Sequence, residues 1–204
     1  MNKSEITKLV EQYSCIENAK DRLFFKLVPL NTAISRKYIF NSIGDIAITC
    51  HILVCQDNEK VISFGVNMSL LHRFGITKDQ LFLMTMENTR KITQPHFDFL
   101  ENYLHVPGSY SYFICDDNNL SGSALFMLPE IMDKVAACID EDFFVIPSSK
   151  NELIFTPVSK ADPVSLTEKI KEINKTVFVG ENGFLSDHLY HFNVEKRSLT
   201  MCGF

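Results

Sequence analysis

The densest group of side chains that could do chemistry lies near the C-terminus, where Asp187, His188 and His191 follow one another closely. Two histidines and a carboxylate are a common ligand set for a catalytic zinc ion. On a helix, the spacing of His188 and His191 would place both rings on one face, whereas on a strand they would face opposite ways. Ser186 and Asp187 could begin a helical turn. Two interpretations therefore stay open: a hydrolase site, with or without a metal ion, and an edge strand with solvated histidines.

A second group, Cys50, His51 and Cys55, lies within one apolar run. A nucleophilic cysteine needs a histidine base within hydrogen-bond reach. On a strand, Cys50 and His51 point to opposite faces, and His51 and Cys55 share a face but lie roughly 13 Å apart. The pattern favours core residues of a central strand over a cysteine nucleophile.

Three other polar positions have both a structural and a functional interpretation. Asn88 lies late in a predicted helix, where it could touch a ligand or make a buried polar contact with a sheet. Ser148 and Ser149 belong to a run of turn-forming residues, which favours a hairpin loop over a ligand-binding loop. The acidic run that begins at Asp116 lacks the glycine and the glutamate of a calcium-binding loop, so it predicts a turn.

Clear local signals predict the strand and the helix that position these residues. Residues 45–55 alternate between two largely apolar sets, which predicts a central strand covered on both faces. Thr77 and Gln80 form a capping box, in which each side chain can satisfy a backbone N–H at a helix start. The helix should run from Lys78 to about Arg90.

Hairpins account for most of the other predicted strands. Three are predicted from apolar runs around polar turns: 110–115 with 121–127, 143–147 with 152–157, and the tail 187–201. The segment 94–108 contains Pro95 and Pro107 and is predicted to be irregular. Aromatic residues in and beside this segment form a candidate contact surface for a partner: Phe97, Phe99, Tyr103 and Tyr110.

These elements together predict the fold class. Because the strands arrive mostly as hairpins, antiparallel pairing should dominate. We expect an α+β fold, with a mainly antiparallel sheet and about five helices packed against it. Residues 1–204 should form a single domain, to which an N-terminal helix over residues 4–20 could be appended.

Composition and charge exclude several classes of protein. The net charge of -5 and the absence of basic runs argue against a binder of duplex nucleic acid. No apolar stretch approaches the roughly 20 residues that span a bilayer, and Glu5 and Glu11 do not fit a secretion signal, so a cytoplasmic location is expected. The six cysteines are scattered without metal-site spacing. We expect free thiols, no metal and no cofactor.

The order of several segments resembles an uncharacterised bacterial family of unknown function that is common in gut anaerobes. The segments include IAITCHILV, the helix pair in NMSLLHRFGITKDQLFLMTMENT, and SDHLYHFNVEKRSLT. The resemblance covers roughly residues 34–199, and residues 146–157 are its most specific part. It implies one fold in one domain and no particular reaction.

Three functions follow as expectations. A strong fold signature without a catalytic constellation favours a non-catalytic binding or regulatory module for a protein or a small molecule. The first alternative is a hydrolase that uses Asp187, His188 and His191. The second is a small anti-defence or signalling protein that sequesters a nucleotide or a partner complex. A homodimer is a candidate assembly for each of them.

Overall fold

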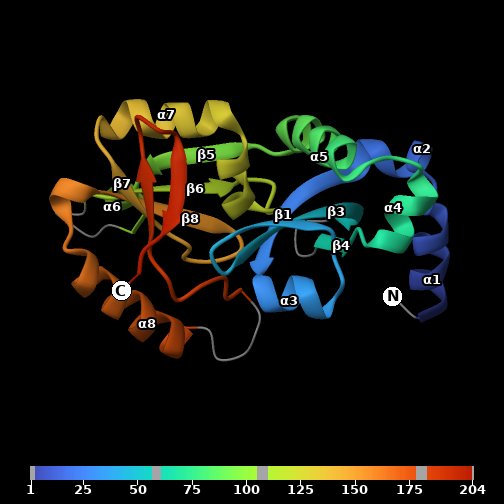
Figure 1. Ribbon diagram of the computed structural model, residues 1–204, viewed down its shortest axis with the longest axis horizontal. Helices are drawn as coiled ribbons and strands as arrows, with labels where there is room; N and C mark the ends of the chain where they lie inside the picture. The colour runs from blue at the N-terminus through green and yellow to red at the C-terminus, as the bar shows by residue number, and fades with distance from the viewer. Residues whose placement is uncertain (1–2, 57–60, 105–109, 178–182, 204) are drawn as a thin grey trace.

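The computed structural model describes residues 3–56, 61–104, 110–177 and 183–203. Two antiparallel sheets lie side by side along the long axis of the molecule (Figure 1). Within the described residues, five helices have seven residues or more, namely α1 (Lys3–Gln12), α4 (Met68–Phe74), α5 (Lys78–Ile92), α7 (Pro129–Ile139) and α8 (Pro163–Val177). The α+β prediction is confirmed, but the strands form two sheets instead of one.

The first sheet is built around the strand that the sequence indicated most clearly. Its strands are β1 (Leu23–Pro29), β2 (Phe40–Ile43), β3 (Ile46–Gln56) and β4 (Val61–Gly65). The strand β3 pairs with all three others, and its first seven residues are buried. The prediction of a central strand is therefore confirmed. The prediction that Cys55 is a core residue is wrong, because the last two residues of β3 are exposed.

The capped helix α5 covers the open edge of this sheet. Thr77 and Gln80 make both hydrogen bonds of the predicted capping box. Near the other end of the helix, the Asn88 amide donates to the Leu23 carbonyl at 2.7 Å, and the Thr89 hydroxyl accepts from the Phe25 N–H at 3.0 Å. These side chains satisfy backbone groups on β1, an edge strand that would otherwise need solvent or another strand. Asn88 thus makes the structural contact of its two interpretations.

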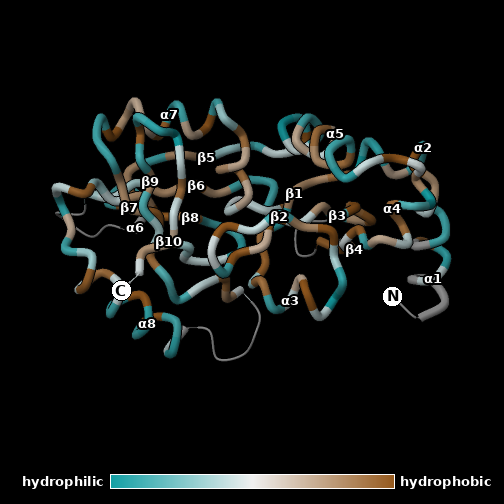
Figure 2. The backbone as a smooth tube through the Cα atoms, viewed as in Figure 1, coloured by the Kyte–Doolittle hydropathy of each residue, from teal (hydrophilic) through white to brown (hydrophobic). Residues whose placement is uncertain are grey.

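The second sheet has six strands in the order β10-β9-β7-β8-β6-β5. They are β5 (Pro95–Phe99), β6 (Tyr112–Asp116), β7 (Phe143–Ile146), β8 (Glu152–Pro157), β9 (Tyr190–Asn193) and β10 (Ser198–Met201). The helices α7 and α8 lie on opposite sides of it (Figure 1), and hydrophobic and hydrophilic residues alternate along both (Figure 2). The hairpins β7–β8 and β9–β10 are confirmed.

Two predictions about this sheet are wrong. The segment predicted to be irregular is ordered over residues 95–104, because Pro95–Phe99 pairs with β6 as an edge strand and α6 (Leu100–Leu104) follows it. Its remaining residues, 105–108, lie outside the described part of the structure. Proline is tolerated at the first position of an edge strand. The predicted strand 121–127 is instead a 3-10 helix, η2 (Gly122–Met127), so β6 has no hairpin partner there and pairs with β5 and β8.

The remaining described elements are short. The N-terminal helix is interrupted, because α1 ends at Gln12 and is followed by α2 (Ile16–Ala19) and η1 (Lys20–Arg22). The segment between β1 and β2 contains α3 (Leu30–Ser35), and η3 (Val158–Lys160) follows β8. None of the described helices combines the length and the apolar content needed to cross a membrane.

One hydrophobic cluster joins the two sheets. It contains Leu27 and Ile48 from the first sheet, and Val145 and Phe155 from the second. A smaller cluster under α8 holds Phe144, Ile170 and Leu189. The boundary between the sheets is therefore packed, and side chains at this boundary are held from both sides.

The ring of His51 on β3 is buried on the face of the first sheet opposite α5. It is 5% exposed and lies 5.1 Å from the Tyr38 ring and 6.1 Å from the Phe24 ring. Within the described residues, its Nε2 atom has no hydrogen-bond partner. Burial, reinforced by the charge of Lys26, lowers the pKa of His51 from 6.5 to about 3.

We expect His51 to make the stability of the protein depend on pH. Below pH 6.5, His51 binds a proton in the unfolded chain but not in the folded protein. The free energy of unfolding should therefore fall as the pH falls toward 3. The loss from this group should reach about 2 kcal/mol at pH 5, at about 1.4 kcal/mol per pH unit. Urea unfolding of the wild type and His51→Leu at pH 7 and pH 5 measures it.

The leucine variant should lose most of this pH dependence. His72→Gln, which changes an exposed histidine on α4, is the matched control and should keep it. Equal losses between pH 7 and pH 5 in the wild type and in His51→Leu would contradict the assignment.

Candidate functional site

The tight turn between β2 and β3 meets the C-terminal hairpin at the boundary between the sheets. The turn consists of Gly44 and Asp45, and Gly44 has a φ angle of +55°. A Cβ atom on Gly44 would lie 2.8 Å from Sδ of Met201 and 2.9 Å from the Tyr190 hydroxyl. Glycine therefore permits both the left-handed backbone and the close approach of the hairpin.

The Asp45 carboxylate collects three side-chain contacts from one short segment. The Ser186 hydroxyl lies 2.8 and 2.9 Å from its two oxygens, His188 Nδ1 lies 3.0 Å from Oδ2, and the Tyr190 hydroxyl donates to Oδ1. These partners occupy alternate positions, and we call the four residues the Asp45 cluster. The intervening residues turn toward α8: Asp187 accepts from Asn174, and Leu189 packs with Ile170.

The geometry of the Asp45 cluster favours fixing the chain over nucleophilic catalysis. Ser186 is fully buried, and its hydroxyl donates to Asp45 and accepts from the backbone N–H of His188. A Ser–His catalytic pair would instead require the hydroxyl to donate to the imidazole. Burial, followed by the hydrogen bond to Asp45, raises the pKa of Tyr190, so this phenol remains a donor.

A hollow of about 360 Å³ borders the Asp45 cluster. Apart from Asp45 and Asn31, its lining is apolar and includes Leu30, Ile34 and Phe184. No cationic side chain lines it among the described residues, so the hollow supplies no side-chain charge to stabilise an oxyanion. The Asp45–His188 pair thus borders a mainly apolar hollow.

The other predicted members of the histidine cluster take separate partners. His191 Nε2 lies 3.3 Å from the Asp142 carboxylate, whereas His188 contacts Asp45. The pKa of Asp142 is lowered chiefly by the backbone N–H of Val194. Asp187, His188 and His191 thus do not converge, as their spacing on a strand indicates. In the part of the chain that the structure describes, no three His, Cys, Asp or Glu side chains are grouped to hold a metal ion.

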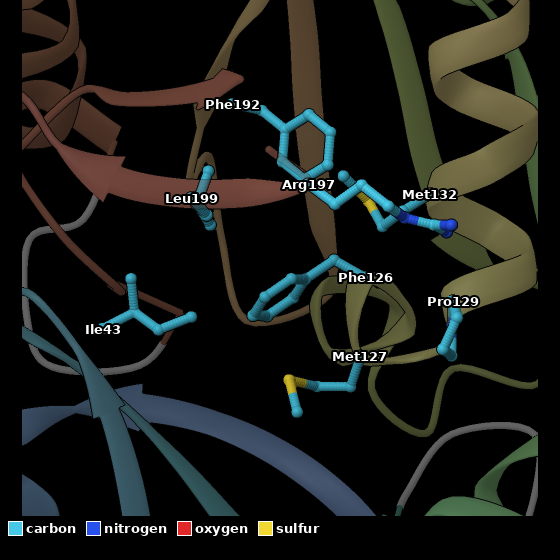
Figure 3. A pocket seen from close by; sticks show the side chains of 8 residues that line it. All are labelled: Ile43, Phe126, Met127, Pro129, Met132, Phe192, Arg197 and Leu199. Carbon is cyan, nitrogen blue, oxygen red and sulfur yellow. The ribbon is translucent and has the colours of Figure 1, made fainter. Parts of the chain in front are cut away.

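An apolar groove opens beside the Asp45 cluster, between the β9–β10 hairpin and the start of α7 (Figure 3). Its volume of about 480 Å³ lies within the range of small-molecule sites. Its lining comes from four parts of the chain and is apolar except at one position: Ile43, Phe126, Met127, Pro129, Met132, Phe192, Arg197 and Leu199. This set is called the apolar groove below.

A second, smaller cavity lies next to the apolar groove, between the two sheets. Ile43, Phe126 and Leu199 also line this cavity, whose volume is about 20 Å³. Leu27 lines this cavity from the first sheet, and Val145 and Tyr190 line it from the second. The volume is close to the minimum that one water molecule needs, and an apolar cavity of this kind stays dry. Tyr190 therefore belongs both to the cavity wall and to the Asp45 cluster.

The single charge in the apolar groove is neutralised by a neighbour. The guanidinium of Arg197 is paired with the Asp133 carboxylate on α7. Arg197 has a φ angle of +50°, which is uncommon for a residue other than glycine. The ion pair joins the tip of the hairpin to α7, so the charge of Arg197 is balanced by Asp133, which lies outside the lining of the groove.

Ser148 and Ser149 act within the β7–β8 turn. The Ser148 hydroxyl donates to Glu152 at 3.0 Å, and the Ser149 hydroxyl accepts the Asn151 N–H at 3.1 Å. The Ser149 N–H also closes the turn on the Glu152 carbonyl. These bonds support the hairpin-loop interpretation of both serines.

The predicted aromatic contact surface is divided between the core and the surface. Phe97 stacks on Tyr112 at 5.4 Å, and Phe99 meets the edge of the same ring at 4.6 Å, so both pack on the protein's own sheet. Tyr110 is 56% exposed. The side chain of Tyr103 lies outside the described part of the structure. The prediction assumed that these aromatic side chains are exposed. Of Phe97, Phe99 and Tyr110, only Tyr110 is exposed.

Sequence reasoning missed Asp45 and the apolar groove. Asp45 lies 141 residues from Ser186, and no local pattern predicts that contact. The alternation of Ser186, His188 and Tyr190 could have indicated a shared polar face. The groove needs side chains from η2, where the sequence pattern predicts a strand.

Comparisons with known proteins give a family and no activity. A search of curated proteins found no match, and a search of solved structures found none either. A model of a protein family described as a family of unknown function, DUF5688, matches residues 1–194. This match includes the whole Asp45 cluster and most of the apolar groove. The chain therefore belongs to the DUF5688 family.

Proposed function

We propose that this protein is a non-catalytic binding module whose ligand is an uncharged, mainly aliphatic small molecule held in the apolar groove. The observation that carries the proposal is the apolar lining of a groove of about 480 Å³, which shares Ile43, Phe126 and Leu199 with the small cavity between the sheets. A flexible chain can lie in the groove with its apolar side against these shared residues. Burial of such a chain is the main source of affinity in sites of this kind.

The lining supports an uncharged and flexible ligand. Arg197 already has Asp133 as its counter-ion, so a charged ligand would have to compete with that pair. Met127 and Met132 contribute unbranched side chains that adapt to irregular apolar shapes. The Asp45 cluster supports the site indirectly, because it holds the segment that leads into the β9–β10 wall.

We expect the protein to bind N-phenyl-1-naphthylamine, an uncharged probe whose fluorescence rises in apolar surroundings. Linear alcohols should displace the probe, and their affinity should rise about fourfold with each added methylene, equivalent to about 0.8 kcal/mol, until the groove is filled. A fluorescence titration with 1-hexanol, 1-octanol and 1-decanol measures this dependence.

A pair of matched variants locates the site. Met127→Glu places a charge in the apolar groove and should weaken probe binding at least tenfold. Met68→Glu makes the same change on α4, where the side chain is 53% exposed and lies outside the groove, and should leave binding within twofold of wild type. Equal binding by both variants, or no saturable binding by the wild type, would overturn the proposal.

A further inference from the structure

A second cleft lies on the face of the six-stranded sheet opposite the apolar groove. On β8, Leu153 and Phe155 face the main core, whereas Ile154 and Thr156 face the side covered by α8. There the sheet, the start of α8, Tyr110 and Ser111 line a cleft of about 390 Å³. We call this space the α8 cleft. It shares no residue with the apolar groove.

The floor of the α8 cleft is mostly apolar and has one polar point. Ile146 and Ile154 form the sheet side, and Leu166 faces them from α8. Thr156 is only 6% exposed, and its hydroxyl lies 2.8 Å from the Ser111 hydroxyl. The floor can therefore take the apolar body of a ligand, with a pair of hydroxyl groups at one point of the wall.

The rim of the α8 cleft carries an excess of positive charge. Lys160 and Lys169 line it, and Asp162 is the one carboxylate among its lining residues. The Asp162 carboxylate accepts the Ser165 N–H at 2.8 Å at the start of α8, and this contact lowers its pKa. The Lys160 ammonium lies 5.0 Å from the centre of the Tyr110 ring. The carboxylate is thus engaged in capping the helix, while Lys160 and Lys169 bring two positive charges to the lining.

We infer that the α8 cleft binds a small organic anion, with an apolar body on the floor and a carboxylate or phosphate group beside Lys160 and Lys169. Charge complementarity distinguishes this ligand from the uncharged one proposed for the apolar groove. The Tyr110 ring, which is 56% exposed, covers one side of the body and steadies the Lys160 ammonium. The inference does not depend on the proposed function, because the two sites lie on opposite faces of the sheet.

Isothermal titration of the whole protein with decanoate, kept below its micelle concentration, tests the inference. The wild type should bind decanoate in this cleft, more weakly as the salt concentration rises. Lys160→Glu with Lys169→Glu should weaken binding at least tenfold. Lys171→Glu with Lys175→Glu, which makes the same change in net charge on exposed residues of α8, should change it less than twofold. Acetate, which lacks an apolar body, should not compete.

The outcomes separate the two sites. Selective loss in the Lys160 and Lys169 variant, with probe binding in the apolar groove unchanged, supports the inference. Equal losses in the two double variants, or no loss in either, would overturn it. Loss of decanoate binding in Met127→Glu would place decanoate in the apolar groove, which would overturn the inference and leave the proposed function standing.

Discussion

Replacement of Gly122 by alanine is expected to lower the free energy of unfolding by at least about 3 kcal/mol. A Cβ atom on Gly122 would lie 1.9 Å from the Asn151 carbonyl oxygen and 2.7 Å from the Asp116 nitrogen. Both are backbone atoms, so the clash cannot be relieved by rotation of a side chain. Either the β7–β8 turn or the end of β6 would have to move. Urea unfolding monitored by circular dichroism measures the change.

Gly75→Ala is the matched control for this prediction. Gly75 ends α4 with a φ angle of +65°, and no atom lies within 4 Å of its ideal Cβ position. Alanine there should cost about 1 kcal/mol, from backbone conformation alone. A cost for Gly122→Ala no larger than that for Gly75→Ala would contradict the close packing of η2 against the β7–β8 turn.

Asp45→Ala is expected to lower the free energy of unfolding by about 3 kcal/mol. The variant leaves the buried Ser186 hydroxyl without its acceptor and removes charge-assisted bonds from His188 and Tyr190. The expected loss is smaller than the sum of these three contacts, because the Asp45 side chain is 37% exposed and solvent weakens its interactions. Tyr190 keeps a second contact, to the Ile43 carbonyl at 3.2 Å. Asp45→Asn, which retains one acceptor oxygen, should cost about half as much.

Asp133→Ala provides the comparison on α7. Asp133 is paired with Arg197, and both side chains are 59% exposed, so its loss should cost less than about 1 kcal/mol. Chemical denaturation of the wild type, Asp45→Ala, Asp45→Asn and Asp133→Ala ranks the losses in the free energy of unfolding. A cost for Asp45→Ala as small as that for Asp133→Ala would mean that the Asp45 cluster does not hold the C-terminal segment in place.

Local signals in the sequence predicted the elements whose structure is decided locally. The capping box at Thr77 and Gln80, the glycine that ends α4 and the turn formers at Ser148 and Ser149 each satisfy backbone groups within a few residues. The alternation in β3 also held over its first seven residues, because a strand buried on both faces needs two apolar sets.

Contacts distant in sequence decided what local patterns could not. The apolar run 121–127 fits a strand, yet the Ser123 hydroxyl bonds the Lys150 carbonyl and Gly122 packs on Asn151, which places η2 against the β7–β8 turn. The sequence predicts Asp187 as the carboxylate partner of His188, whereas the structure supplies Asp45. Candidate sites at the boundary between the sheets depend on contacts of this kind.

The position of an uncharged ligand is the most direct test of the proposed function. Methionine methyl groups labelled with carbon-13 can be followed by NMR while 1-decanol is added to the wild-type protein. The proposal predicts saturable shifts for Met127 and Met132, which line the apolar groove, and none for Met68 on α4. Unchanged signals from Met127 and Met132 at a concentration of 1-decanol that displaces the fluorescent probe would contradict it.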